Sequence, residues 1–154
     1  MTTAKILHAE IECKSSADKF WPSLRDLVYV YPKAFPPGTY KSIEVLEGDG
    51  VQPGSVRVRT YGEGSPIAMF KEKIEVVDEQ NKIFGFSIMD GDLIKGYKSL
   101  KCSAQVVPKD EASLLKFSCE YEKAADEDIV EPTVIVDFAV KLLKQIDDYS
   151  VMQA

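Results

Sequence analysis

Glu72 is the ionisable residue with the most unusual place in the sequence. In the segment 67–77 it shares its parity with the apolar residues Phe70 and Ile74. Alternate residues of a strand point to one face, so Glu72 is predicted to point inward, where an unpaired carboxylate is costly or has a raised pKa. We expect it to meet a cationic or hydroxylated ligand, or to act as an acid or base. The alternatives are a β-bulge that turns it outward and an internal Tyr or Lys partner.

The other reactive residue types narrow the chemistry. His8 is the single histidine of the sequence and has the parity of Glu10 and Glu12, so it is expected on a wet face. With one histidine on a wet face, the sequence lacks a residue that most catalytic triads and zinc sites require. The 3 cysteines are far apart, and Cys102 and Cys119 are interpreted as small apolar residues of the core. We expect neither a metal nor a cofactor.

Composition excludes several classes of protein. The 154 residues carry 25 acidic and 19 basic side chains, a formal net charge of −6. This length suits one domain, here residues 1–154, and this charge disfavours binding of nucleic acid and ribonuclease activity. No segment approaches the roughly 20 apolar residues of a membrane helix, and the N-terminus lacks the apolar core of a secretory signal. We expect a cytoplasmic monomer that does not insert into membranes.

The elements that must position these residues begin with a strand and two short helices. Residues 4–14 alternate between apolar and polar, which predicts a strand with one wet face. Ser15 and Ser16 then predict a short helix with a hydroxyl cap, and 28–31 a second helical piece. Pro32, Pro36 and Pro37 are expected to end regular structure there.

The remainder predicts strands followed by one helix. Turn signals separate six further strands, at 41–47, 55–61, 67–77, 82–89, 95–107 and 112–123. Apolar residues at helical spacing from Val134 to Ile146 predict a long C-terminal helix, with the acidic run Asp126–Asp128 and Pro132 at its start. Asp147 and Asp148 lie at its negative end, which the sequence does not explain.

This order of elements predicts an α+β fold in which one strongly curved antiparallel sheet of seven strands covers the last helix. Six segments resemble, in order, the major latex protein branch of the plant Bet v 1 (pathogenesis-related class 10) family. They are Ser16–Phe20, Tyr31–Phe35, Lys41–Gly50, Lys71–Ile74, Glu120–Lys123 and Asp137–Lys141. The resemblance covers essentially the whole chain. It implies the helix-grip fold, with two short helices and a large internal cavity.

The glycine-rich connection contains Gly48, Asp49, Gly50 and Gly54. It lacks the Lys of a phosphate loop, and a strand follows it where a nucleotide site needs a helix. The resemblance implies that it is the family's glycine-rich loop, beside the cavity.

The residues expected to line the cavity have inward parity or lie on the apolar stripe of the last helix. They are Phe20, Tyr31, Phe35, Val56, Val58, Phe70, Glu72, Ile74, Phe84, Phe86, Ile88, Leu100, Cys102, Phe117, Cys119, Tyr121, Ile135, Phe138, Ala139 and Leu142. Plain core packing is the alternative for each. Tyr31 could lie at the cavity mouth, and the segments 31–40, 62–66 and 90–95 are the expected movable parts.

The resemblance implies a cytosolic plant protein that binds or carries a hydrophobic small molecule and is linked to defence or stress. The alternative is a cofactor-free enzyme, an isomerase or cyclase that acts on an alkaloid-like substrate by proton transfer in the cavity. Its candidate residues would be Glu72, Tyr121 and Lys98, since Lys98 has the parity of the apolar residues around it. The enzyme is the less favoured of the two.

Overall fold

The computed structural model describes residues 4–35, 40–91, 93–124 and 131–153. Its elements are β1 (Lys5–Cys13), α1 (Ala17–Arg25), α2 (Leu27–Ala34), β2 (Tyr40–Glu47), β3 (Val56–Tyr61), β4 (Met69–Asp78), β5 (Ile83–Gly91), β6 (Tyr97–Lys109), β7 (Ala112–Lys123) and α3 (Pro132–Val151). The strands form one antiparallel sheet in the order β1-β7-β6-β5-β4-β3-β2. The predicted fold class is confirmed, and the expected strands differ from these only at their ends.

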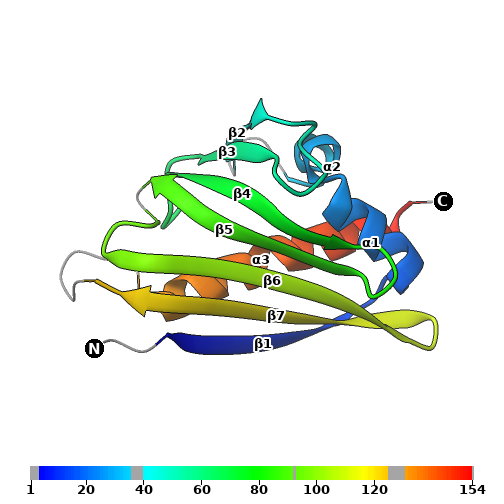
Figure 1. Ribbon diagram of the computed structural model, residues 1–154. Coiled ribbons are helices and arrows are strands. Elements are labelled where there is room, and N and C mark those ends of the chain that lie inside the picture. Colours follow the sequence, from blue (N-terminus) through cyan, green and yellow to red (C-terminus); the bar gives the residue numbers. More distant parts are fainter. Residues whose placement is uncertain (1–3, 36–39, 92, 125–130, 154) are drawn as a thin grey trace.

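The long helix α3 lies across one face of the sheet, and α1 and α2 lie at the end of the sheet near the C-terminus (Figure 1). The apolar stripe of α3 supplies Ile135, Leu142, Leu143 and Ile146 to the core. Neither face could bury its apolar side chains alone, so the sheet and the helix stabilise each other. In the described ranges, no helix is both long and apolar enough to cross a membrane.

The helical region extends beyond the expected stop. Pro32 lies inside α2, which continues to Ala34, and the Phe35 N–H donates to the Tyr31 carbonyl at 3.2 Å. A proline lacks a backbone donor and crowds the carbonyl four residues before it, but the donors that follow it can still close the last turn of a helix. The expectation for Pro32 is therefore wrong. Pro36, Pro37 and the acidic run at 126–128 lie outside the described residues.

The residues just before α1 are bound to Asp147 of α3. This contact, which we call the tether, explains the acidic residue at the negative end of α3, which the sequence did not. Ser16 is the N-cap of α1, but its hydroxyl makes no capping hydrogen bond, so the expected cap is wrong. Instead, Asp147 of α3 accepts hydrogen bonds from the Lys14 N–H at 2.9 Å and from the Ser15 N–H and hydroxyl at 3.0 and 2.6 Å. The carboxylate thus binds the backbone donors just before the helix.

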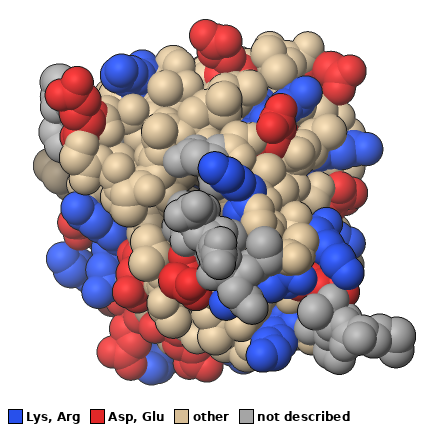
Figure 2. Space-filling view, turned by 90° about the vertical axis from the view of Figure 1, so that its left-hand side faces the viewer, with Lys and Arg blue, Asp and Glu red and all other residues tan. Residues whose placement is uncertain are grey.

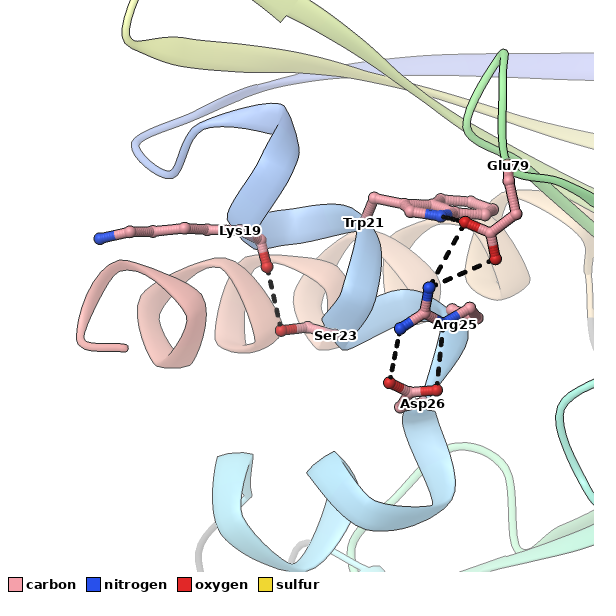
Figure 3. Close-up of polar contacts among 6 residues, drawn as sticks. All are labelled: Lys19, Trp21, Ser23, Arg25, Asp26 and Glu79. Carbon is pink, nitrogen blue, oxygen red and sulfur yellow. Dashed lines mark hydrogen bonds and ion pairs between the residues drawn. The ribbon is translucent and has the colours of Figure 1, made fainter. Parts of the chain in front are cut away.

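A second attachment joins the helix pair to the turn between β4 and β5 (Figure 3). The Trp21 indole N–H donates to Glu79 at 2.6 Å. Arg25 lies between Glu79 and Asp26, with ion-pair distances of 3.3 and 3.0 Å. Because these charges are partly exposed, each pair adds little stability by itself, but together they set where α1 sits on the sheet.

Candidate ligand-binding cavity

Strand β3 presents arginines to the interior. Arg57 is fully buried and Arg59 is 7% exposed, whereas Val58 is only half-buried. The ring of Tyr61, which has the same parity as the two arginines, lies 4.9 Å from the ring of Phe138 on α3. The prediction that Val58 points inward is therefore wrong, and Val56 is buried without lining the cavity described below. Alternation predicts which residues share a face, but it chose the wrong face here because Val is more apolar than Arg.

A carboxylate on the neighbouring strand explains why the arginines point inward. Glu72 is inward as predicted and fully buried. Arg59 grips it with two hydrogen bonds, from Nη2 to Oε1 at 2.8 Å and from Nε to Oε2. Arg57 faces Glu72 directly in the β3–β4 register, and its Nη2 lies 3.1 Å from Oε2. The internal partner of Glu72 is thus a pair of guanidiniums rather than a Tyr or Lys.

This cluster carries an excess of one positive charge, since two guanidiniums share one carboxylate. Arg57 donates from Nη1 to the Gly50 carbonyl at 3.3 Å, while its Nε and Nη2 make no hydrogen bond within the described part of the chain. Burial lowers the pKa of Arg57, and Glu72 opposes that shift. For Arg59 burial is also the largest single influence and lowers the pKa, but Glu72, Tyr61 and Tyr31 together outweigh it, so that the pKa is raised. Both side chains stay charged.

Two phenols and several aromatic faces surround Arg59. The Tyr31 hydroxyl donates to the Tyr61 hydroxyl, and burial is the main cause that raises the pKa of both. The Arg59 guanidinium lies 5.3 Å from the ring centres of Phe70 and Phe86. Tyr31 is 1% exposed, so the expectation that it lies at a cavity mouth is wrong.

An internal cavity of about 80 Å³ lies between the sheet and α3. It is lined by Leu24, Leu27, Arg59, Tyr61, Ile67, Phe70, Phe84, Phe86, Ile88, Leu93, Cys102, Ala104, Phe117, Ile135, Phe138, Ala139, Leu142, Leu143 and Ile146. Among the described residues that line it, Arg59 alone is charged. Ordinary ligand sites measure about 300–1,000 Å³. The expected large cavity is therefore wrong for this state of the protein, because aromatic side chains fill most of the space.

Half of the expected lining residues surround this cavity. They are Phe70, Phe84, Phe86, Ile88, Cys102, Phe117, Ile135, Phe138, Ala139 and Leu142. The others lie outside its wall: Phe20, Tyr31, Phe35, Val56, Glu72, Ile74, Leu100 and Cys119 are buried, and Val58 and Tyr121 are half-buried. The apolar spacing of Leu24, Leu27, Leu143 and Ile146 could have predicted their place, whereas Arg59 and Tyr61 were missed because the face of β3 was assigned wrongly.

An open groove of about 470 Å³ adjoins the cavity at the beginning of α3. It is lined by Glu63, Gly64, Ser65, Pro66, Val134, Asp137, Phe138, Lys141, Leu142 and Gln145. Phe138 and Leu142 line both spaces, so these two side chains separate the groove from the cavity. Figure 2 shows the end of the molecule at which α3 begins, where charged side chains lie mostly around the rim.

The three candidate residues of an enzyme are not brought together. Lys98 is exposed, because a shift of register between Tyr97 and Ser99 breaks the alternation of β6, so its predicted inward position is wrong. Tyr121 is half-buried, with its ring 6.1 Å from that of Tyr97. Glu72 is held by the two arginines.

The glycine-rich connection is closed upon itself. Asp49 accepts hydrogen bonds from the Val51 and Gln52 N–H groups at 2.8 Å each, and these bonds lower the pKa of its carboxyl group. Gly50 has a φ of 83° and directs its carbonyl to Arg57. Two backbone donors of this loop, those of Val51 and Gln52, are thus already paired, and the loop supports the buried cluster through the Gly50 carbonyl.

The sequence model of the Pathogenesis-related protein Bet v 1 family matches residues 1–153. The chain belongs to this family. Among its relatives, MLP-like protein 423 of Arabidopsis thaliana is 51% identical, with 99% of this chain and 98% of the relative covered. Ribonuclease 2 of Panax ginseng is 31% identical, with 84% and 86% covered.

Two solved structures share the fold closely. Ginseng major latex-like protein 151 from Panax ginseng superposes with a TM-score of 0.83 at 27% identity, covering 96% of this chain and 98% of that one. Norcoclaurine synthase from Thalictrum flavum gives a TM-score of 0.83 at 25% identity, covering 99% and 89%. The helix-grip architecture is therefore that of the Bet v 1 family, and the relatives include major latex proteins.

Proposed function

We propose that this Bet v 1 family protein binds and carries a hydrophobic small molecule between its sheet and α3, as a cytoplasmic monomer linked to plant defence or stress. The supporting observation is the apolar cavity, whose described lining includes one charged side chain. The Bet v 1 family is known for binding small hydrophobic ligands. Burial of an apolar ligand there would be favoured by the hydrophobic effect.

The size of the cavity requires that it opens when a ligand enters. A space of about 80 Å³ is too small for the molecules that such sites hold. Movement of Phe138 and Leu142 would join it to the groove of about 470 Å³, and the combined space reaches the ordinary size of a ligand site. We therefore expect the side chains of α3 to rearrange during binding.

The test is a titration with the uncharged probe N-phenyl-1-naphthylamine, which fluoresces in apolar surroundings. We expect saturable binding of one probe per chain. Ala139→Phe places a ring in the cavity and should weaken binding at least tenfold, whereas Thr133→Phe, at an exposed position of α3, should not. Failure of the wild-type protein to bind the probe, or equal affinity of both variants, would contradict a ligand site in this cavity.

The alternative is a cofactor-free enzyme that acts by proton transfer on an alkaloid-like substrate. The likeness to norcoclaurine synthase supports it, at 25% identity over nearly the whole chain. The positions of Lys98, Tyr121 and Glu72 do not, since they form no common acid–base site. Turnover of an added alkaloid that is lost in Glu72→Gln and kept in His8→Ala would favour the enzyme over the carrier.

We do not extend the ribonuclease activity named for one relative to this chain. Its single histidine, His8, is exposed on β1, and a net charge of −6 repels RNA.

A further inference from the structure

We propose that the ligand of this interior is an apolar anion, a molecule with a hydrophobic body and one acidic head group that pairs with Arg59. The inference rests on the proposed function and names the class of ligand. Glu72 alone led us to expect a cationic or hydroxylated ligand. That carboxylate belongs to a cluster with excess positive charge, so we now infer an anionic one.

The charges of the interior carry the argument. Arg57, Arg59 and Glu72 leave one positive charge without an ionic partner, in a place that is largely shielded from solvent. The other buried charge of the described residues, Asp147, is engaged with the backbone at Lys14 and Ser15. An unpaired buried charge is unfavourable, so an anion that enters would gain more than a neutral molecule of the same shape.

The groups around the arginines reduce this charge but do not cancel it. Tyr31 and Tyr61 remain protonated at neutral pH, since burial raises the pKa of both phenols. The Gly50 carbonyl accepts one hydrogen bond from Arg57, and the faces of Phe70 and Phe86 attract Arg59. These partners offer dipoles and ring faces, each weaker than an ion.

Once Phe138 has moved aside, a head group can reach Arg59 from the groove. Phe138 lies between the groove and the cavity, the Tyr61 ring contacts it, and both Tyr61 and Arg59 line the cavity. Because Tyr31 donates to the Tyr61 oxygen, the Tyr61 proton is directed elsewhere and can be donated to an acidic head group. Arg59 and Tyr61 thus supply a charge and a hydrogen-bond donor side by side, while the apolar wall accepts the body of the ligand.

The first test uses the wild-type protein and three ligands with one alkyl chain: dodecanoate, dodecan-1-ol and dodecylammonium. Each is titrated as a competitor of N-phenyl-1-naphthylamine at pH 7, below its micellar concentration or, for dodecan-1-ol, its solubility limit. We expect dodecanoate to bind at least tenfold more tightly than dodecan-1-ol, and dodecylammonium to bind most weakly. Equal affinities would overturn this inference and leave the carrier intact. No binding of any of the three, nor of the probe, would overturn the carrier itself.

The second test changes the charge of the cluster in both directions. Arg59→Gln makes it neutral and should reduce the preference for dodecanoate over dodecan-1-ol to less than twofold. Glu72→Gln removes the single negative charge of the cluster, so its net positive charge rises, and the preference should increase at least threefold. Lys116→Gln removes a charge from an exposed position of β7 and serves as the control.

Two further variants cover a failure of Arg59→Gln to fold and binding of the head group in the outer groove. Arg59→Lys retains the charge if Arg59→Gln does not fold, and it should retain the preference for the anion. Lys141→Gln alters the outer groove. Loss of the preference in Lys141→Gln but not in Arg59→Gln would place the head group outside the cavity and overturn the assignment to Arg59. The comparison of the three dodecyl ligands does not depend on any variant.

Discussion

Asp147 lies near the C-terminal end of α3, where the helix dipole disfavours a negative charge, yet it is 4% exposed. Its three hydrogen bonds to Lys14 and Ser15 compensate, because bonds to a charged acceptor are stronger than neutral ones. We expect Asp147→Asn to lower the free energy of unfolding by about 2–3 kcal/mol in a urea titration.

The neighbouring carboxylate provides a matched control. Asp148 pairs with the Lys14 ammonium at 3.2 Å, but both side chains are well exposed. Asp148→Asn should therefore change the free energy of unfolding by less than about 0.5 kcal/mol. Equal losses in the two variants would show that Asp147 does not act as the tether.

Cys13 makes the stability depend on pH in the alkaline range. Burial, and then the charge of Asp147, raises the pKa of its thiol from 9.0 to about 11. The folded state therefore holds this proton more tightly than the unfolded chain, so the contribution is complete below the unfolded pKa and disappears as pH rises through the folded pKa. Between pH 9 and 11, the wild-type protein should lose about 1–2 kcal/mol more than Cys13→Ala, after allowance for solvent screening. Urea titrations across this range test it, and parallel losses would contradict it.

At the scale of residues, parity predicted the inward position of Glu72 but not its partners. Whether a guanidinium is buried depends on a carboxylate across the sheet, and pairing of β3 with β4 brings Arg57 opposite Glu72. A single sequence ranks Val above Arg for the interior. The positive charge of the candidate site could therefore be recognised only from the pairing of the strands, and not from the sequence alone.

At the scale of elements, the buried ion cluster joins β3 to β4, and its contribution to the free energy of unfolding can be measured. Glu72→Gln leaves two buried guanidiniums without a counter-charge and should lower the free energy of unfolding by about 3–5 kcal/mol. Glu75→Gln is the control on the same strand, because Glu75 is exposed. We would measure both by urea titration at pH 7, and a loss below about 1 kcal/mol in Glu72→Gln would mean that the cluster is solvated.

Strand alternation predicted the elements well and failed at their irregularities. The apolar stripe of α3 and the turn residues sufficed to place the helix and the strands along the chain, but not to place β1 beside β7 in the sheet. A register shift between Ile74 and Val76 turns Val76 outward, with 45% of its surface exposed, and directs Val77 toward the core. The similar shift in β6 exposes Lys98. One inserted residue reverses the parity that follows, and no local signal in the sequence marks its position.

At the scale of the whole molecule, the sequence and its family resemblance predicted that a sheet would grip a helix, but not how much space would remain. That volume depends on the rotamers of many aromatic side chains that meet from different elements, such as Phe84, Phe86 and Phe138. If a few of them changed rotamer, as we propose for ligand entry, the cavity of about 80 Å³ would become continuous with the outer groove. Ligand capacity is therefore a property of side-chain packing rather than of the fold.

Phe138 is the side chain at which this idea can be tested. It lines both the cavity and the groove, and its ring packs edge-on against Tyr61 at 4.9 Å. Phe138→Ala should join the two spaces and speed the association of N-phenyl-1-naphthylamine at least fivefold in stopped-flow fluorescence. Since Phe138 is half-buried, the variant should lose only about 2 kcal/mol of stability. Val140→Ala shortens another half-buried side chain of α3 that lines neither space, so its association rate should match the wild type. Equal rates in both variants would mean that ligands enter elsewhere.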